Sequence, residues 1–167
     1  SVNGKVVSLI GLEAGFHPDL SGSENIYLNG LLIGMRKNEI DAVYESIISF
    51  ADIGDFIEAP LYTYSTGMVL RLGFSIAIHS NPDILILDEG LAVGDEIFRL
   101  KAAKKSHEIM QSDKTLIMVA HWLDNLREYC NKIIWLDNGK IHSKGTIKVL
   151  DEYEQFSKEY SQKIGKK

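Results

Sequence analysis

The chain has 167 residues, 45% of them hydrophobic and 25% charged, and a formal net charge of −5 at pH 7. This length suits one domain, perhaps with a subdomain, and the composition is that of a globular protein rather than a disordered or fibrous one. The acidic balance, with basic residues scattered along helical segments, argues against nucleic acid as a partner, because a nucleic-acid surface needs concentrated positive charge.

The single cysteine, Cys130, cannot form an internal disulfide, so a reducing, cytoplasmic setting is expected. No apolar run approaches the roughly 20 residues that span a bilayer. The opening Ser-Val-Asn-Gly-Lys does not look like a signal peptide. A role at the membrane would therefore depend on a partner.

The first half of the chain predicts one strand followed by helices. Residues 5–10 are short and apolar, as in a buried strand, and lead into a glycine-containing loop over 11–22. Apolar residues at helical spacing predict two helices within 23–51 and a third over 65–79. Pro82 ends this part, because proline disfavours a helical conformation in the residue before it. We expect 23–51 to form a helical insertion.

In the second half, apolar strands alternate with helices. Strands are predicted at 84–87 and 115–119, and helices at about 96–111 and 122–129. Continuous apolar strands separated by helices are typical of a parallel sheet covered on both faces. This half therefore predicts an α/β layer.

The last part of the chain predicts a hairpin and a helix. Residues 133–137 and 140–142 flank Asn138-Gly139, a pair that tolerates positive φ at both central positions of a two-residue turn. A polar-rich helix is expected over 147–162.

Two carboxylates, Asp88 and Glu89, stand where the strand 84–87 ends. Ligands of open α/β sheets bind beyond the carboxyl ends of the strands, and adjacent acids there can hold a divalent metal and polarise a water. Phosphoryl transfer needs both functions. An isolated Asp-Glu pair is more often a strand followed by a surface turn, so the pair alone is only moderately specific.

Two further features belong to the same chemistry. Ser65 can cap the helix 65–79, whose first N–H groups would attract phosphate, although an ordinary serine cap has the same pattern. His121 directly follows the apolar segment 115–120 and is predicted at the same sheet edge as the carboxylates, where a histidine can contact a terminal phosphate.

Taken in order, these segments resemble the ATPase domain of ABC transporters over nearly the whole chain. Tyr64 to Met68 look like the signature motif, 84–89 like the Walker B strand, 92–95 like the D-loop, and Ala120-His121 like the switch histidine. The resemblance implies an α/β core of the P-loop NTPase type, with a mainly parallel sheet and an inserted helical signature subdomain.

The resemblance also implies a role for each candidate residue. Asp88 would organise the water shell of Mg²⁺, Glu89 would be the general base, and His121 would contact the γ-phosphate. Ser65 and Gly67 would bind ATP held by the opposite subunit. The residues implied to bind the ATP cofactor are Ser65, Thr66, Gly67, Met68, Glu13 and Asp95.

Departures from the common pattern narrow the resemblance. Residues 12–18 occupy the place of the Q-loop, where Glu13 stands nearest to the usual glutamine, while Thr66 replaces a signature glycine and Met68 a glutamine. Together with Gly-Phe-His-Pro at 15–18, these residues look like the exporters of teichoic acid and O-antigen polysaccharide. That similarity implies ATP hydrolysis powering export of a cell-envelope polysaccharide.

The sequence contains no Gly-x-x-x-x-Gly-Lys-Ser/Thr, the loop whose backbone cradles nucleotide phosphates. We therefore expect an N-terminally truncated subunit that lacks the first strands of its core and is inactive alone. The predicted parts are the end of the first core portion with the Q-loop region (1–22), the helical subdomain with the signature motif (23–80), and the second core portion with the C-terminal helix (81–167).

The implied partners are a second ATPase subunit, forming a homodimer in the parent protein, and an integral-membrane permease that holds the subunit on the inner face of the membrane. Two other functions stay open. The chain could be a non-catalytic nucleotide-sensing or dimerisation module, or a soluble ABC ATPase of repair or translation, which the acidic balance and the Gly-Phe-His-Pro loop disfavour.

Overall fold

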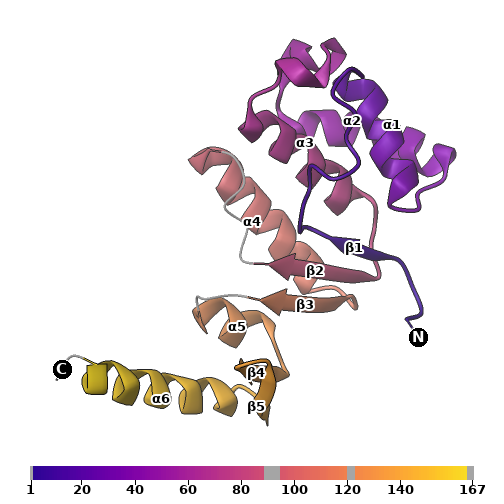
Figure 1. The fold of residues 1–167 in the computed structure, drawn as a ribbon. Helices are drawn as coiled ribbons and strands as arrows, with labels where there is room; N and C mark the ends of the chain where they lie inside the picture. The colour runs from indigo at the N-terminus through magenta and orange to yellow at the C-terminus, as the bar shows by residue number, and fades with distance from the viewer. Residues whose placement is uncertain (1, 89–94, 120–122, 165–167) are drawn as a thin grey trace. The chain divides into compact units, whose positions relative to one another are not determined.

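The structure is a computed structural model that describes residues 2–88, 95–119 and 123–164, with Asp88, Met110 and residues 162–164 described through their backbones. It divides into two compact units, Ser1–Val119 and Ala120–Lys167, and each is considered by itself (Figure 1). The three-part division inferred from the sequence stays a prediction.

The first unit contains a parallel sheet of three strands in the order β1-β2-β3. The strands are β1 (Val6–Ser8), β2 (Ile84–Asp88) and β3 (Thr115–Val119). Ser8 pairs with Ile86, and Asp88 pairs with Val119. The three strands therefore run toward a common edge, as the α/β prediction requires.

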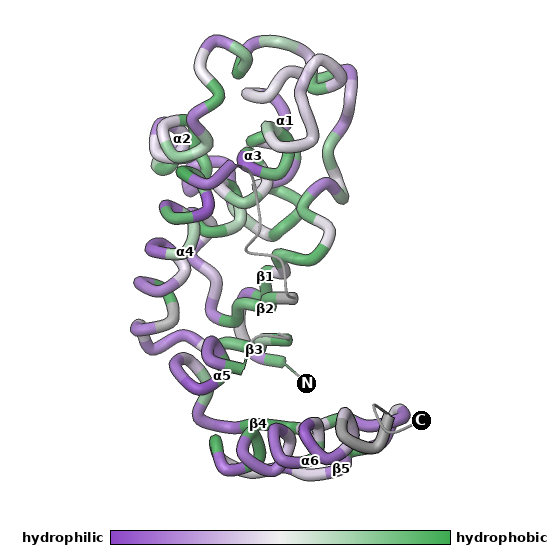
Figure 2. The backbone as a smooth tube through the Cα atoms, turned by 90° about the vertical axis from the view of Figure 1, so that its left-hand side faces the viewer, coloured by the Kyte–Doolittle hydropathy of each residue, from purple (hydrophilic) through white to green (hydrophobic). Residues whose placement is uncertain are grey.

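Two helices pack on one face of this sheet, α3 (Thr66–His79) and α4 (Glu96–Met110). Val7 of β1 is buried in one cluster with Phe74 of α3 and Phe98 of α4. Figure 2 shows that the strands are hydrophobic along most of their length. In a β-strand, side chains at alternate positions point to opposite faces of the sheet. On the other face Ile117 and Val119 of β3 are 50% and 58% exposed. Among the described residues of this unit, the helices that cover the sheet lie on one face.

The two helices predicted within 23–51 and the third over 65–79 are present, and the structure adds two short helices between them; we call this group of helices the helical insertion. It consists of α1 (Gly22–Leu32), α2 (Lys37–Ala51), two short 3₁₀ helices, η1 (Gly54–Glu58) and η2 (Leu61–Thr63), and then α3. Their packing buries isoleucines and leucines from all three α-helices, with Ile26, Ile40 and Leu72 fully inaccessible. The two 3₁₀ helices have five and three residues, which is too short for a hydrophobic periodicity to be detected in the sequence.

Local signals explain where α1 and α2 begin and end. Ser21 and Glu24 form a capping box at the start of α1, each side chain bonding the other's backbone N–H. At the start of α2 the Glu39 carboxylate accepts both the backbone N–H of Arg36 at 2.7 Å and a guanidinium N–H of Arg36 at 2.9 Å, while the Arg36 side chain accepts nothing. Asp52 then ends α2 in the left-handed conformation.

The second unit contains a helix, a hairpin and a second helix. These are α5 (Leu123–Tyr129), β4 (Ile133–Asp137), β5 (Lys140–Gly145) and α6 (Lys148–Ile164). Asn138 and Gly139 both have positive φ, 47° and 74°, so the predicted two-residue turn is confirmed. Trp135 of β4 is buried with Val149 and Leu150 of α6. None of the described helices has the length and apolar character that crossing a membrane requires.

Candidate nucleotide-binding site

The N-terminus of α3 has the properties of an anion site. The Ser65 hydroxyl accepts a hydrogen bond from the Met68 N–H at 3.2 Å, and the Ser65 carbonyl accepts one from the Val69 N–H at 3.0 Å. Within the part of the chain that the structure describes, the N–H groups of Thr66 and Gly67 have no acceptor. Unbonded N–H groups and the positive end of the helix dipole both favour a phosphate at this position.

Gly67 lies beside open space. A Cβ added there would have a single neighbour within 4 Å, the Ser65 Oγ at 3.9 Å, and the φ of Gly67 is not positive. Nothing within the described chain therefore requires glycine, which weakens a helix by about 1 kcal/mol relative to alanine. A bare backbone at an open helix end suits a ligand that approaches closely, so these residues fit a nucleotide phosphate.

The other two signature residues are placed differently from each other. Thr66 is exposed at the first position of α3, whereas Met68 packs its side chain against the core of the helical insertion. The N–H of Met68 is already bonded to Ser65. Gly67 and Thr66 thus offer the unbonded donors, and Met68 mainly anchors the helix.

Asp95, the last residue of the predicted D-loop, begins α4. Its Oδ1 accepts the Phe98 N–H at 2.9 Å, and its Oδ2 lies 3.6 Å from Nη1 of Arg71 on α3. The sequence reasoning missed Arg71. Its signal is a lone cation within the apolar run Val69-Leu70-Arg71-Leu72, and such a residue needs a partner when the helix is packed.

The predicted catalytic residues are only partly described. Asp88 ends β2 and pairs in register with Val119, so its backbone lies at the carboxyl edge of the sheet. The Asp88 side chain, Glu89 and His121 lie outside what the structure describes. Among the described residues no group of three or more His, Cys, Asp or Glu could hold a metal ion.

Glu13 lies in the turns that follow β1, and its side chain is exposed. The carbonyl of Glu13 accepts the Phe16 N–H at 3.2 Å. The neighbouring Leu12 packs directly on α3, since a Cβ added to Gly73 would lie 2.7 Å from the Leu12 carbonyl oxygen. The predicted Q-loop therefore contacts the predicted signature helix.

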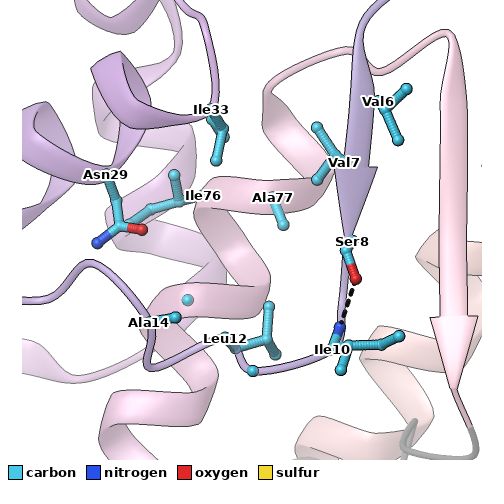
Figure 3. A pocket seen from close by; sticks show the side chains of 12 residues that line it. Val6, Val7, Ser8, Ile10, Leu12, Ala14, Asn29, Ile33, Ile76 and Ala77 are labelled. Atoms are coloured by element: carbon cyan, nitrogen blue, oxygen red, sulfur yellow. Dashed lines mark hydrogen bonds between the residues drawn. The ribbon is translucent and has the colours of Figure 1, made fainter. Parts of the chain in front are cut away.

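A cavity of about 200 Å³ lies beside this contact, between β1, the following turn, α1 and α3 (Figure 3). Most of its lining is apolar, including Val7, Ile33 and Ala77. Asn29 also lines it, and its side-chain nitrogen is buried with no hydrogen-bond partner among the described residues. This lining differs from the open N–H groups of α3, so the cavity is not the predicted phosphate site.

The sequence matches no protein-family model, but it is similar to curated export proteins. It is 43% identical over 155 residues to the O-antigen export system ATP-binding protein of Myxococcus xanthus, covering 92% of this chain and 36% of that protein. It is 43% identical over 156 residues to the teichoic acids export ATP-binding protein of Bacillus anthracis, covering 93% of this chain and 28% of that protein. For the O-antigen export system ATP-binding protein of Klebsiella pneumoniae the identity is 39%, covering 93% of this chain and 63% of that protein.

The chain thus spans about a third of the length of the first two relatives. Among solved structures it is similar to an ATP-binding subunit of an ABC transporter, with a TM-score of 0.72 and 18% identity over 92% of this chain and 62% of that one. It is also similar to a dimeric, post-hydrolysis ATP-binding cassette bound to ADP and Pi, with a TM-score of 0.64 and 20% identity over 86% of this chain and 63% of that one. Over most of its length the chain is therefore similar in sequence to O-antigen and teichoic acid export ATP-binding proteins, and its fold is that of the ATP-binding domains of ABC transporters.

Proposed function

We propose that this chain is the part of an ATP-hydrolysing subunit that carries the signature helix, in a transporter exporting a cell-envelope polysaccharide of the teichoic-acid or O-antigen type. The observation that carries the proposal is the N-terminus of α3, where Thr66 and Gly67 offer unbonded N–H groups beside open space. The names of the relatives, which are export ATP-binding proteins, support the same activity and substrate class.

The residue roles belong to this proposal. Asp88 holds Mg²⁺ through its water shell, Glu89 is the general base, and His121 contacts the terminal phosphate. Bound Mg²⁺ and ATP would supply the charge neutralisation and the transferable phosphoryl group that such hydrolysis needs. Ser65 and Gly67 bind the nucleotide of a second ATPase subunit, whose phosphate loop holds it from the other side.

The partners follow from the same reasoning. Two ATPase subunits enclose the nucleotides, and an integral-membrane permease holds them at the inner face of the membrane. Glu13 lies in the loop proposed to receive the permease, and that loop packs on α3 through Leu12 and Gly73. A movement of the loop therefore has a direct route to the signature helix.

A chimera tests the activity. The aligned 156 residues of the Klebsiella pneumoniae relative are replaced by this chain, and the chimera is produced with that relative's permease. We expect ATP hydrolysis and O-antigen at the cell surface. Glu89→Gln should keep ATP binding and lower turnover by at least roughly 10²-fold, the loss typical of a missing general base.

Glu45→Gln is the matched control, because Glu45 is an exposed glutamate of α2 outside every predicted motif. It should leave turnover unchanged. A chimera that binds ATP without hydrolysing it, while the unaltered relative hydrolyses it normally, would replace this proposal with a non-catalytic nucleotide-sensing module.

A further inference from the structure

Gly22 and Tyr64 form a close contact at the entrance to the signature helix. Gly22 is the first residue of α1, and Tyr64 immediately precedes Ser65, the N-cap of α3. A Cβ added to Gly22 would overlap the Tyr64 Oη and would lie 3.0 Å from the carbonyl oxygen of Ile57. The φ of Gly22 is not positive, so glycine is required at this position for space rather than for backbone freedom.

Tyr64 is held on more than one side. Its hydroxyl donates a hydrogen bond to the carbonyl of Phe56 in η1, and its ring meets the Phe56 ring edge-on at 6.2 Å between centroids. The ring also packs against the core of the helical insertion. A side chain with these contacts has little freedom to move, and Ser65 is bonded directly to it.

A short ladder joins the same two regions of the chain. The Tyr62 N–H donates to the Pro18 carbonyl and the Leu61 N–H to the Leu20 carbonyl, both at 2.9 Å. The Gly22 N–H donates to the Ala59 carbonyl at 3.3 Å. The segment after the predicted Q-loop is therefore hydrogen-bonded to the segment before the signature motif.

We propose that Tyr64, seated in the space left by Gly22, is a positioning residue that sets the place of Ser65 and of the N–H groups of Thr66 and Gly67. Through the ladder, displacement of the loop that contains Glu13 reaches the start of α3. This inference rests on the proposed function. It adds to that function the contacts that fix the position of the signature motif relative to the Q-loop.

The test compares Gly22→Ala, Tyr64→Phe and the double variant in the chimera. The added methyl of Gly22→Ala displaces the phenol, and kcat for ATP, corrected for the folded fraction, should fall by roughly 10- to 100-fold, as expected for a misplaced binding group. KM for ATP should change less than kcat. Tyr64→Phe removes the overlapping oxygen, so the double variant should recover most of the kcat lost by Gly22→Ala.

Gly30→Ala is the matched control. It is a second glycine of α1 whose added Cβ would meet a side chain, at 2.7 Å from Cδ1 of Ile40, without reaching Tyr64. It should lower the thermal midpoint while leaving kcat per folded molecule unchanged, and Tyr64→Phe should not rescue it. Equal effects of the two glycine substitutions on kcat, or a double variant no better than Gly22→Ala, would overturn the proposal.

A second readout is independent of hydrolysis. The NMR amide chemical shifts of Thr66 and Gly67, compared with that of Ile26 in the core, should change in Gly22→Ala and return in the double variant. If the chimera is folded but inactive, the proposed function fails while this readout still decides the positioning role. Unchanged shifts of both amides in Gly22→Ala would then refute it.

Discussion

Arg71 on α3 and Asp95 at the start of α4 form an ion pair, with Nη1 of Arg71 3.6 Å from Oδ2 of Asp95. The Arg71 side chain is 18% exposed, and its guanidinium lies 5.9 Å from the centre of the Phe98 ring. The other oxygen of Asp95 caps α4. The Asp95 carboxylate thus caps the N-terminus of α4. It also links the proposed signature helix, α3, to the end of the proposed D-loop.

Substitutions at Asp95 should separate these two contributions. Asp95→Asn retains an oxygen that can cap α4 and loses the charge facing Arg71, whereas Asp95→Ala loses both. We expect Asp95→Ala to lower the free energy of unfolding by about 1 kcal/mol more than Asp95→Asn, the usual value of an N-cap. Urea unfolding of the two variants measures the difference, and equal losses would show that the cap contributes nothing.

Gly67→Ala should change stability and activity in opposite directions. Alanine meets no atom closer than 3.9 Å and favours the helix, so the free energy of unfolding should rise by up to about 1 kcal/mol. ATP hydrolysis in the chimera should fall, because the methyl group occupies the space proposed for phosphate. Phosphate release and thermal unfolding test both halves; full activity in the more stable variant would contradict the proposed contact.

Asn25 and Asn29 are buried on the same helix and should respond differently to replacement by leucine. The Asn25 amide accepts the His17 N–H at 2.8 Å and donates to the carbonyls of His17, Leu20 and Ser21 at 2.9 to 3.1 Å. Asn25→Leu should therefore cost at least about 2 kcal/mol of unfolding free energy, because it removes four hydrogen bonds and leaves the His17 N–H without its acceptor.

Asn29→Leu serves as the comparison, since the side-chain nitrogen of Asn29 has no partner among the described residues. Its unfolding free energy should stay within about 1 kcal/mol of the parent, because no bond of that nitrogen is lost. Chemical unfolding of both variants checks the pair. A loss at Asn29 as large as that at Asn25 would mean that side-chain shape, rather than hydrogen bonding, controls the stability of α1.

Tyr64 should make stability depend on pH at alkaline values. Burial of the phenol raises the pKa of Tyr64 from its ordinary value of 10.0 to about 12. Between these values the unfolded chain releases the phenol proton while the folded chain keeps it, so this stability is present below pH 10 and is lost as the pH rises toward 12. The stability advantage of the parent over Tyr64→Phe should therefore shrink between pH 10 and 12. Urea unfolding of both proteins at pH 8, 10 and 11 measures this difference in unfolding free energy. A difference that stays constant over this range would show that the Tyr64 phenol has the same pKa in the folded and unfolded chains.

The elements that sequence reasoning predicted correctly are those whose causes lie within a few residues. The turn at Asn138-Gly139 needs two residues that accept positive φ, the start of α3 needs the hydroxyl of Ser65, and β2 needs an apolar run. Each depends on local backbone hydrogen bonds and propensities. The roles of Asp88, Glu89 and His121 come from motif order and stay predictions.

The tertiary structure alone decided the contacts between residues that are far apart in the chain. The space at Gly22 filled by the Tyr64 hydroxyl, the ion pair of Arg71 with Asp95, and the packing of Leu12 on Gly73 have no local signature. A glycine in a helix or an arginine in an apolar run indicates that the position has a special contact, but the sequence does not identify the residue it contacts. The partner is decided by how α1, α3, α4 and the turn after β1 pack, because close packing leaves only one arrangement in which these groups fit together.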